Sequence, residues 1–231
     1  SVEREASLEL TIGRHPKQTT KVIDEDLAWV LGLWVAEGTL EKYHINFHLG
    51  PHEAALASKL AEKINSSLGL RCAIHRGYDR QIRIYFSNIK LIQYLEQNFG
   101  RGALNKRIPR WLSEAPKNVI RAFLDGLIAG DGTENKTDRG SRIRLKTASW
   151  QLAHGVMELL YKLGFVPSFF SEEAHPTEFK GKQSYSARSY SISVSTHKWR
   201  GTRAASKRSY TRGQVDDLYV YLPVKHVSHR E

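Results

Sequence analysis

The sequence has 231 residues, enough for one large domain or two smaller ones, and its 40% apolar content supports a buried core. Lysine and arginine outnumber aspartate and glutamate by 35 to 24, and the net charge of +11 points first to a polyanionic partner such as nucleic acid. The single cysteine, Cys72, excludes an internal disulfide framework, and the longest apolar run, residues 27–36, is too short to cross a bilayer. We therefore expect a soluble intracellular protein of the cytoplasm or nucleoid, without membrane contact.

The first half of the chain, residues 24–116, follows an N-terminal extension, residues 1–23. Apolar residues at helical spacing predict a helix that ends with the stretch VLGLWVAEG at residues 30–38. Beyond it, alternating apolar and polar residues predict strands, and helical spacing closed by a glycine predicts helices. The expected elements are a strand at 43–49, a helix at 53–68, strands at 70–75 and 81–86, a helix at 89–99 and a basic connector at 104–116.

The second half, residues 117–196, repeats this order. A polar insertion, residues 172–183, is expected between its last two strands. The remaining residues, 197–231, are a basic segment and tail, in which residues 197–213 contain no acid. Such a run is typical of an arm held near phosphates, and Arg200 is our DNA-binding candidate there, although a solvated segment fits the run equally well. The expected elements are a helix at 119–131, a strand at 142–148, a helix at 150–163 and strands at 165–170 and 185–195.

One helical stretch occurs twice, because residues 124–132 (LDGLIAGDG) repeat the pattern of residues 30–38. We expect Gly38 and Gly132 to take the left-handed conformation that ends a helix, which places Glu37 and Asp131 in the last turns. An exposed acid there is disfavoured by about 0.3–1 kcal/mol, because it meets the negative end of the helix dipole. A divalent cation held between carboxylate and carbonyl oxygens reverses that penalty. The alternative, two solvated acids at loop mouths, suits a single copy better than a repeated one.

Small residues four apart predict how the two helices meet. Gly32 and Ala36 share one helix face, Gly126 and Gly130 share the equivalent face of the other, and their size lets two backbones approach closely. The helices are expected to run side by side and bring both acids to one point. The resulting metal-site candidates are Glu37, Asp131 and the backbone carbonyls of Ala36 and Gly130.

Strand alternation places polar residues on the faces turned away from the core. These faces are expected to contain no acid, and their residue types hydrogen-bond base edges and phosphates. An antiparallel ribbon is also thin enough for a major groove, so we predict two DNA-binding faces. The candidates are His44, Asn46, His48, Gln81, Arg83 and Tyr85 in the first half and Arg142, Arg144, Lys146, Ser191 and Ser193 in the second.

Two lysines occupy matching places in the halves. Lys90 follows the last strand of the first half, and Lys198 follows the last strand of the second. A basic group near a scissile phosphate stabilises transition-state charge, which makes both lysines catalytic candidates. An ordinary phosphate contact or a surface lysine is the alternative interpretation for each.

Both copies of the repeated stretch resemble the LAGLIDADG motif of homing endonucleases, and the order of elements resembles that family over nearly the whole chain. The connector at residues 106–112 (KRIPRWL) and the ending at residues 222–227 (LPVKHV) resemble the intein-encoded branch. Since Ser1 is followed by no visible splicing residues and a terminal His-Asn pair is missing, we expect an excised or splicing-independent endonuclease. The chain departs from the motif at Val35 and Ala129, where its earlier acid would stand, and at Glu37, where aspartate is usual.

The resemblance implies an α+β fold of two pseudo-symmetric αββαββα half-domains, whose antiparallel sheets form a saddle over DNA, with the motif helices packed at the interface. It implies a monomer that makes a metal-dependent double-strand break in a long, non-palindromic target. Glu37 and Asp131 match the metal-binding acids, and Lys90 and Lys198 match basic positions near the cleavage centre. The expected cofactor is Mg²⁺, with Mn²⁺ as a substitute and Ca²⁺ binding without supporting cleavage. A non-cleaving DNA-binding protein or an RNA maturase on the same fold is the alternative.

Overall fold

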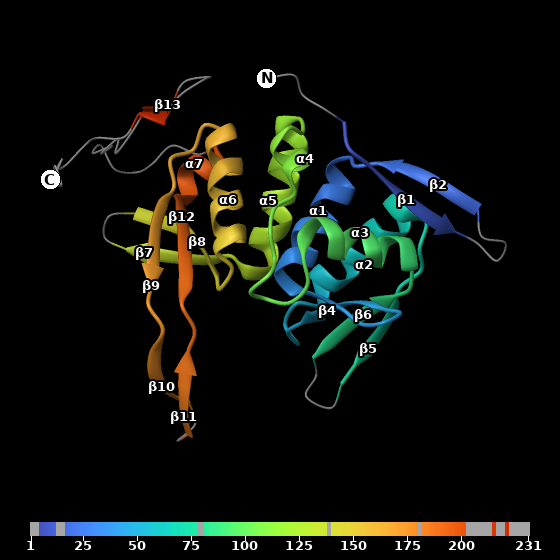
Figure 1. Cartoon of the computed structure of the whole chain (residues 1–231), viewed down its shortest axis with the longest axis horizontal. Coiled ribbons are helices and arrows are strands. Elements are labelled where there is room, and N and C mark those ends of the chain that lie inside the picture. The colour runs from blue at the N-terminus through green and yellow to red at the C-terminus, as the bar shows by residue number, and fades with distance from the viewer. Residues whose placement is uncertain are drawn as a thin grey trace, which may run out of the picture.

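Two half-domains lie on either side of a central pair of helices, α1 and α5, in the computed structural model (Figure 1). The structure describes residues 5–12, 17–77, 81–137, 140–179, 182–201, 214–215 and 220–221. Each half contributes one four-stranded antiparallel sheet, and the strand orders β3-β4-β6-β5 and β7-β8-β12-β9 are equivalent. The predicted α+β architecture of two αββαββα halves is thereby confirmed.

The first half begins where Asp24 caps α1, its side chain accepting a hydrogen bond of 2.9 Å from the Leu27 backbone N–H. The predicted helices at 53–68 and 89–99 are confirmed within one residue. Gly69 ends the former in the left-handed conformation, with φ of 68°. The elements are α1 (Glu25–Glu37), β3 (Gly38–Leu40), β4 (Ile45–Leu49), α2 (Ala54–Leu68), β5 (Ala73–Arg76), β6 (Ile82–Phe86) and α3 (Ile89–Phe99).

The second half follows a connector that contains a short helix, α4 (Arg110–Ser113). Ser149 caps α6, since its Oγ accepts a hydrogen bond of 3.2 Å from the Leu152 N–H. The elements are α5 (Lys117–Asp131), β7 (Thr133–Thr137), β8 (Gly140–Thr147), α6 (Trp150–Lys162), β9 (Ser168–Glu172), β12 (Ser189–Ser195) and α7 (Thr196–Arg200).

Several strands were missed by periodicity. Strand β3 is too short to show alternation, and β7 is an edge strand made of polar residues. The polar insertion forms a hairpin of β10 (His175–Phe179) and β11 (Lys182–Ser186), so the predicted strand at 185–195 was wrong in joining β11 to β12. Two further hairpins are β1 (Ser7–Ile12) with β2 (Lys17–Val22), and β13 (Gln214–Val215) with β14 (Val220–Tyr221).

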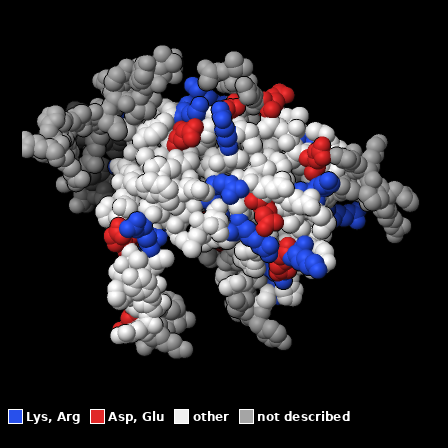
Figure 2. All heavy atoms as spheres, viewed as in Figure 1, with Lys and Arg blue, Asp and Glu red and all other residues white. Residues whose placement is uncertain are grey.

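The core lies between the helices and the inner faces of the sheets. Ile45, Phe47 and Leu49 of β4 are buried as their alternation predicts, and Ile143 and Leu145 of β8 are buried in the same way. The outer faces are mostly polar. In Figure 1 the β5–β6 pair and the β10–β11 ribbon extend beyond the helices in the same direction, and Figure 2 shows a concave edge between them. Among the described residues, no helix is long and apolar enough to cross a membrane.

Candidate active site and nucleic-acid interface

Helices α1 and α5 pack backbone to backbone. A Cβ atom added to Gly32 would collide with the Phe123 carbonyl and lie 2.9 Å from the Leu127 nitrogen. One added to Gly126 would collide with the Trp29 carbonyl and lie 3.0 Å from the Leu33 nitrogen. No side chain fits between the helices at these points, so each glycine is required by close approach. The structure thus places all four predicted interface residues, Gly32, Ala36, Gly126 and Gly130, along this seam.

Glu37 and Asp131 are the last residues of α1 and α5, respectively. The Glu37 side chain passes over Gly130, because a Cβ added to Gly130 would lie 3.0 Å from the Glu37 Cγ and 2.5 Å from the Ala36 Cβ. The seam therefore ends with the two acids as neighbours. Both helices lead at once into edge strands, β3 and β7, so the acids lie where the helix pair meets the two sheets.

The glycines that follow the acids do not behave as predicted. Gly38 has φ of −88° and ψ of 144°, and Gly132 has φ of −76° and ψ of 123°, so both are extended rather than left-handed. Their role is again steric. A Cβ added to Gly38 would lie 2.5 Å from the Trp34 Cγ, and one added to Gly132 would lie 2.7 Å from the Ile128 Cγ2. Glycine is needed because the chain folds back tightly against the last helical turn.

Lys106, from the connector, packs against the end of α1. Its ammonium group donates hydrogen bonds to the carbonyl oxygens of Val35, Ala36 and Gly38, at 3.4 Å for Ala36 and 3.2 Å for Gly38. These carbonyls end α1, where a cation is favoured by the helix dipole. The Lys106 backbone is fixed from the other side, because its carbonyl accepts a hydrogen bond of 2.5 Å from the Ser149 Oγ at the start of α6.

The three charged groups perturb each other in a partly desolvated site. Burial is the main cause that raises the pKa of Glu37, and the Asp131 and Glu53 carboxylates raise it further while Lys106 opposes them. Burial also raises the pKa of Asp131 against the influence of Lys106, although Asp131 keeps a solvent-accessible side. Burial lowers the pKa of Lys106, and both acids oppose that shift. Two carboxylates therefore share one lysine, which leaves an unbalanced negative charge.

This donor set fits a hard divalent cation. Two carboxylates lie beside helix-end carbonyls, and burial, which raises the pKa of both acids, disfavours their ionised forms unless a further cation is bound. Mg²⁺ is commonly held through one or two carboxylates, with water and phosphate oxygens completing its shell. Among the described residues, no group of three or more His, Cys, Asp or Glu side chains is arranged to hold a metal. A site completed by its substrate is consistent with both observations.

Lys90 and Lys198, the two predicted catalytic lysines, are surface residues. Lys90 is exposed in the first turn of α3, and Lys198 is exposed in α7. Within the described part of the chain, the cation that influences the pKa of both acids is Lys106. The sequence marks Lys106 only as one of several basic residues in the connector. No periodicity relates it to the helix ends, so the sequence carries no signal that selects it over Arg107 or Arg110.

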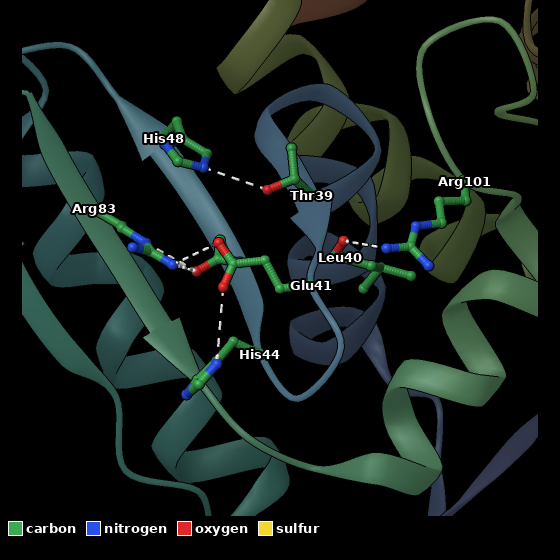
Figure 3. Close-up of polar contacts among 8 residues, drawn as sticks. Thr39, Leu40, Glu41, His44, His48, Arg83 and Arg101 are labelled. Carbon is green, nitrogen blue, oxygen red and sulfur yellow. Dashed lines mark hydrogen bonds and ion pairs between the residues drawn. The ribbon is translucent and has the colours of Figure 1, made fainter.

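The outer face of the first sheet carries a polar network around Arg83 (Figure 3). The Arg83 guanidinium donates to the Asn46 Oδ1 at 2.9 and 2.7 Å and to the Glu41 Oε1 at 2.8 Å. Tyr85 lies against the Arg83 guanidinium and the His44 ring. His48 shares a hydrogen bond of 3.3 Å with the Thr39 hydroxyl on the same sheet. Gln81 is exposed just before β6.

Two features of this network correct the sequence prediction. Asn46 is fully buried beneath it, with an amide nitrogen that lacks a hydrogen-bond partner, so it is not an open surface residue. The face is also not free of acids, because Glu41 at the end of β3 forms an ion pair with Arg83. Alternation along β4 and β6 could not reveal this acid, since Glu41 reaches the face from the adjoining turn.

The outer face of the second sheet braces its arginines differently. Arg144 donates to the Ser191 Oγ at 3.2 and 2.8 Å, while Arg142 donates to the Ser193 Oγ at 3.3 Å and the Ser168 Oγ at 2.8 Å. A neutral hydroxyl thus orients the Arg144 guanidinium without cancelling its charge. Here too the prediction of an acid-free face was wrong, because Lys146 forms an ion pair with Glu172 at 2.7 Å.

Arg200 lies outside the sheet, in α7, where it forms an ion pair of 2.8 Å with Glu134. Trp199 anchors this helix to α5, since its indole N–H donates to the Asp125 Oδ1 at 3.0 Å and the Arg121 guanidinium stacks on its ring. The rest of the predicted basic arm, residues 202–213, lies outside the described residues.

Comparison with known protein families finds a match in the second half of the chain. Residues 118–198 match the family model described as a LAGLIDADG-like domain. This half of the chain is a LAGLIDADG-like domain. Among curated proteins, the chain is 34% identical over 169 residues to replication factor C small subunit of Methanocaldococcus jannaschii, and 27% identical over 155 residues to a DNA polymerase of Thermococcus hydrothermalis. Each match covers 66% of this chain and spans only 9% of the relative's length.

A solved structure extends the likeness to both halves. A variant of I-DmoI, in complex with its target DNA and Mn, is 18% identical, with a TM-score of 0.50 that covers 76% of this chain and 90% of that one. At this identity the likeness establishes the fold alone, and the fold is the two-sheet LAGLIDADG arrangement.

Proposed function

We propose that this protein is a site-specific DNA endonuclease that makes a metal-dependent double-strand break in a long target. The observation that carries this proposal is the meeting of Glu37 and Asp131 at the end of the glycine seam, with Lys106 beside them. One acid comes from each half, so the centre is built by the duplication itself. Two acids with one partly buried lysine lie where two outward-facing sheets converge.

A divalent metal supplies Lewis-acid activation of the phosphodiester and of the attacking water at such a site. Glu37 and Asp131 would hold it, with the Gly130 carbonyl as a further candidate. The Ala36 carbonyl, the other candidate from the sequence, already accepts a hydrogen bond from Lys106. Lys106 keeps a positive charge close to the scissile phosphate, where it stabilises negative charge that develops on the phosphate oxygens. Its anchoring through Ser149 fixes that charge before the substrate arrives, which lowers the reorganisation needed during reaction.

The two sheets supply the proposed DNA interface. Arg83, Arg142 and Arg144 are already oriented by hydrogen bonds, and an oriented arginine loses less entropy when it binds a base or a phosphate. Two such faces cover roughly two helical turns, or about 20 bp. The I-DmoI structure, a complex with DNA and Mn, supports the same use of this fold. Because the halves carry different side chains, we expect the target to be non-palindromic and one chain to suffice as a monomer.

An intein origin forms part of the proposal. The matched relatives have unrelated printed names, replication factor C small subunit and DNA polymerase, yet each matches this chain over a small part of its length. A segment shared by otherwise different proteins behaves as a portable unit, which supports an intein-type endonuclease domain. Host-sequence comparison around the matched segment tests this part separately.

The direct test is selection and cleavage of a randomised duplex library with Mg²⁺, with Ca²⁺ and without metal. The proposal expects a single enriched target that is cut on both strands with Mg²⁺ and bound without cleavage in Ca²⁺. Asp131→Asn is the matched inactive control and should still bind. Binding without cutting under every metal condition would instead indicate a non-cleaving DNA-binding protein, and preference for a structured RNA would indicate a maturase.

A further inference from the structure

Two consecutive phenylalanines in β9 have opposite environments. Phe169 turns toward α6 and joins an aromatic cluster, with ring centroids 6.1 Å from Trp150, 5.6 Å from His154 and 6.1 Å from Tyr190. Phe170 points to the other side of the sheet and is 63% exposed. The inner residue is explained by core packing. The outer one is an aromatic ring on a polar face.

The strand register defines the surroundings of Phe170. It lies opposite Ser191 on β12, and Ser191 lies opposite Lys146 on β8, so the three side chains form one row across the outer face. Along β9, Ser168 and Glu172 flank it on the same face. All four neighbours are polar, and each has a hydrogen-bond partner within the face: Arg142 for Ser168, Arg144 for Ser191, and Glu172 and Lys146 for each other. Phe170 is the apolar residue among them.

The first half has a different residue at the equivalent place. There the matching row runs from His48 on β4 through Arg83 on β6 to His75 on β5. His75 can hydrogen-bond a base edge or a phosphate, whereas Phe170 can do neither. At this row position the apolar ring occurs in the second half and not in the first, so the duplicated fold does not require it.

We propose that Phe170 is a specificity-determining residue that recognises the 5-methyl group of one thymine in the major groove. This inference rests on the proposed DNA-binding function. Base edges in that groove offer donors, acceptors and one apolar feature, the thymine methyl, and apolar side chains read it by direct contact. Arg142 and Arg144 on the same face supply donors for guanine and for phosphates. Phe170 adds the one kind of recognition that they cannot provide.

Removing the 5-methyl group from one thymine at a time tests this proposal. After a target is selected with the full chain in Ca²⁺, each thymine is replaced in turn by deoxyuridine, which removes only the methyl group. At one position the unaltered protein should lose affinity about three- to fivefold, the effect of exposing one methyl-sized group. Phe170→Ala should bind thymine and deoxyuridine equally at that position, while Phe170→Leu should retain part of the preference.

The controls separate the possible failures. Tyr185→Ala removes another strongly exposed aromatic side chain, on β11, and should leave the deoxyuridine effect unchanged. Because Phe170 is exposed, Phe170→Ala should unfold at the same temperature as the unaltered protein. If no duplex is enriched, the proposed function fails. If a duplex is bound but no thymine responds to methyl removal, or the response persists in Phe170→Ala, the assignment of Phe170 is overturned while DNA binding stands.

Discussion

The two half-domains share a skeleton but differ at their surfaces. In both, a glycine allows α1 and α5 to touch, an acid ends the helix, and four strands follow in the same order. On the outer faces, Arg83 of the first half is held by a carboxylate, while Arg144 of the second is held by a hydroxyl. The two halves thus share the seam glycines and the terminal acids, and they differ in the outer-face residues that we propose to contact DNA. Changes in the skeleton should therefore have large and equal effects, and changes at the surfaces small and unequal ones.

After the two acids themselves, the largest effect on activity is expected at Lys106, the lysine that influences the pKa of both acids among the described residues. Lys106→Met removes the cation shared by both acids and should reduce single-turnover cleavage by about 10²–10³-fold. Lys117→Met, in the exposed first turn of α5, is the matched control and should keep the full rate. Lys90→Met and Lys198→Met should lose less than Lys106→Met. A larger loss at either would restore the sequence prediction and displace Lys106.

Substitution of the seam glycine in either half should reduce the free energy of unfolding by a similar amount. Gly32→Ala and Gly126→Ala each drive a Cβ into a backbone carbonyl, so each should lower the free energy of unfolding by about 3 kcal/mol or more. Urea titration followed by circular dichroism measures both, and Glu158→Ala on the exposed side of α6 should change it by less than about 0.5 kcal/mol. If either substitution reduces the free energy of unfolding by less than about 1 kcal/mol, the two glycines are not equally required for helix packing.

Neutralising either acid should stabilise the protein, whereas substituting either seam glycine should destabilise it. Burial raises the pKa of Glu37 and Asp131, so the folded protein binds more protons than the unfolded chain between the ordinary and the raised values. Stability is therefore lost as pH rises through that interval. At pH 7 without divalent metal, Glu37→Gln and Asp131→Asn should each raise the melting temperature, by at most about 2–4 °C. The gain should vanish at a pH below the ordinary carboxyl pKa. Lower melting temperatures for both variants at pH 7 would contradict the pKa directions.

The smallest effects are expected at the surfaces. Glu41→Gln releases Arg83 from its ion pair, so DNA affinity should rise and its logarithmic salt slope should steepen by about 0.9, the value for one added phosphate contact. Ser191→Ala removes a neutral brace from Arg144, so it should weaken binding slightly and leave the salt slope unchanged. Fluorescence anisotropy over a salt series measures both. Equal slope changes in the two variants would remove the electrostatic difference between the halves.

Local pattern explains why much of this arrangement was predictable. The repeated apolar stretches predicted α1 and α5. Their small residues predicted the close helix contact, and their last acids predicted the acidic centre. These features were predictable because helix periodicity and helix ends depend on residues that are close in sequence. The predicted left-handed conformations of Gly38 and Gly132 were wrong. Glycine is required there because the backbone packs closely against Trp34 and Ile128, and the local sequence does not show that contact.

Long-range contacts explain what the sequence could not show. Lys106 meets α1 only through the course of a connector, and Glu41 meets Arg83 only through sheet register. Phe170 was placed within a predicted strand, but its exposure depends on which side of the sheet α6 covers. Such placements follow from tertiary packing rather than from any spacing along the chain.

The central claim is that Glu37 and Asp131 form one shared centre that cuts both strands. It is tested most directly by strand-resolved, single-turnover cleavage of the selected duplex with each strand labelled, comparing the unaltered protein, Glu37→Gln and Asp131→Asn in Mg²⁺. Neither variant should make a double-strand break, while both should bind the duplex with Ca²⁺ as the unaltered protein does. A double-strand break made by either variant at the unaltered rate would contradict it.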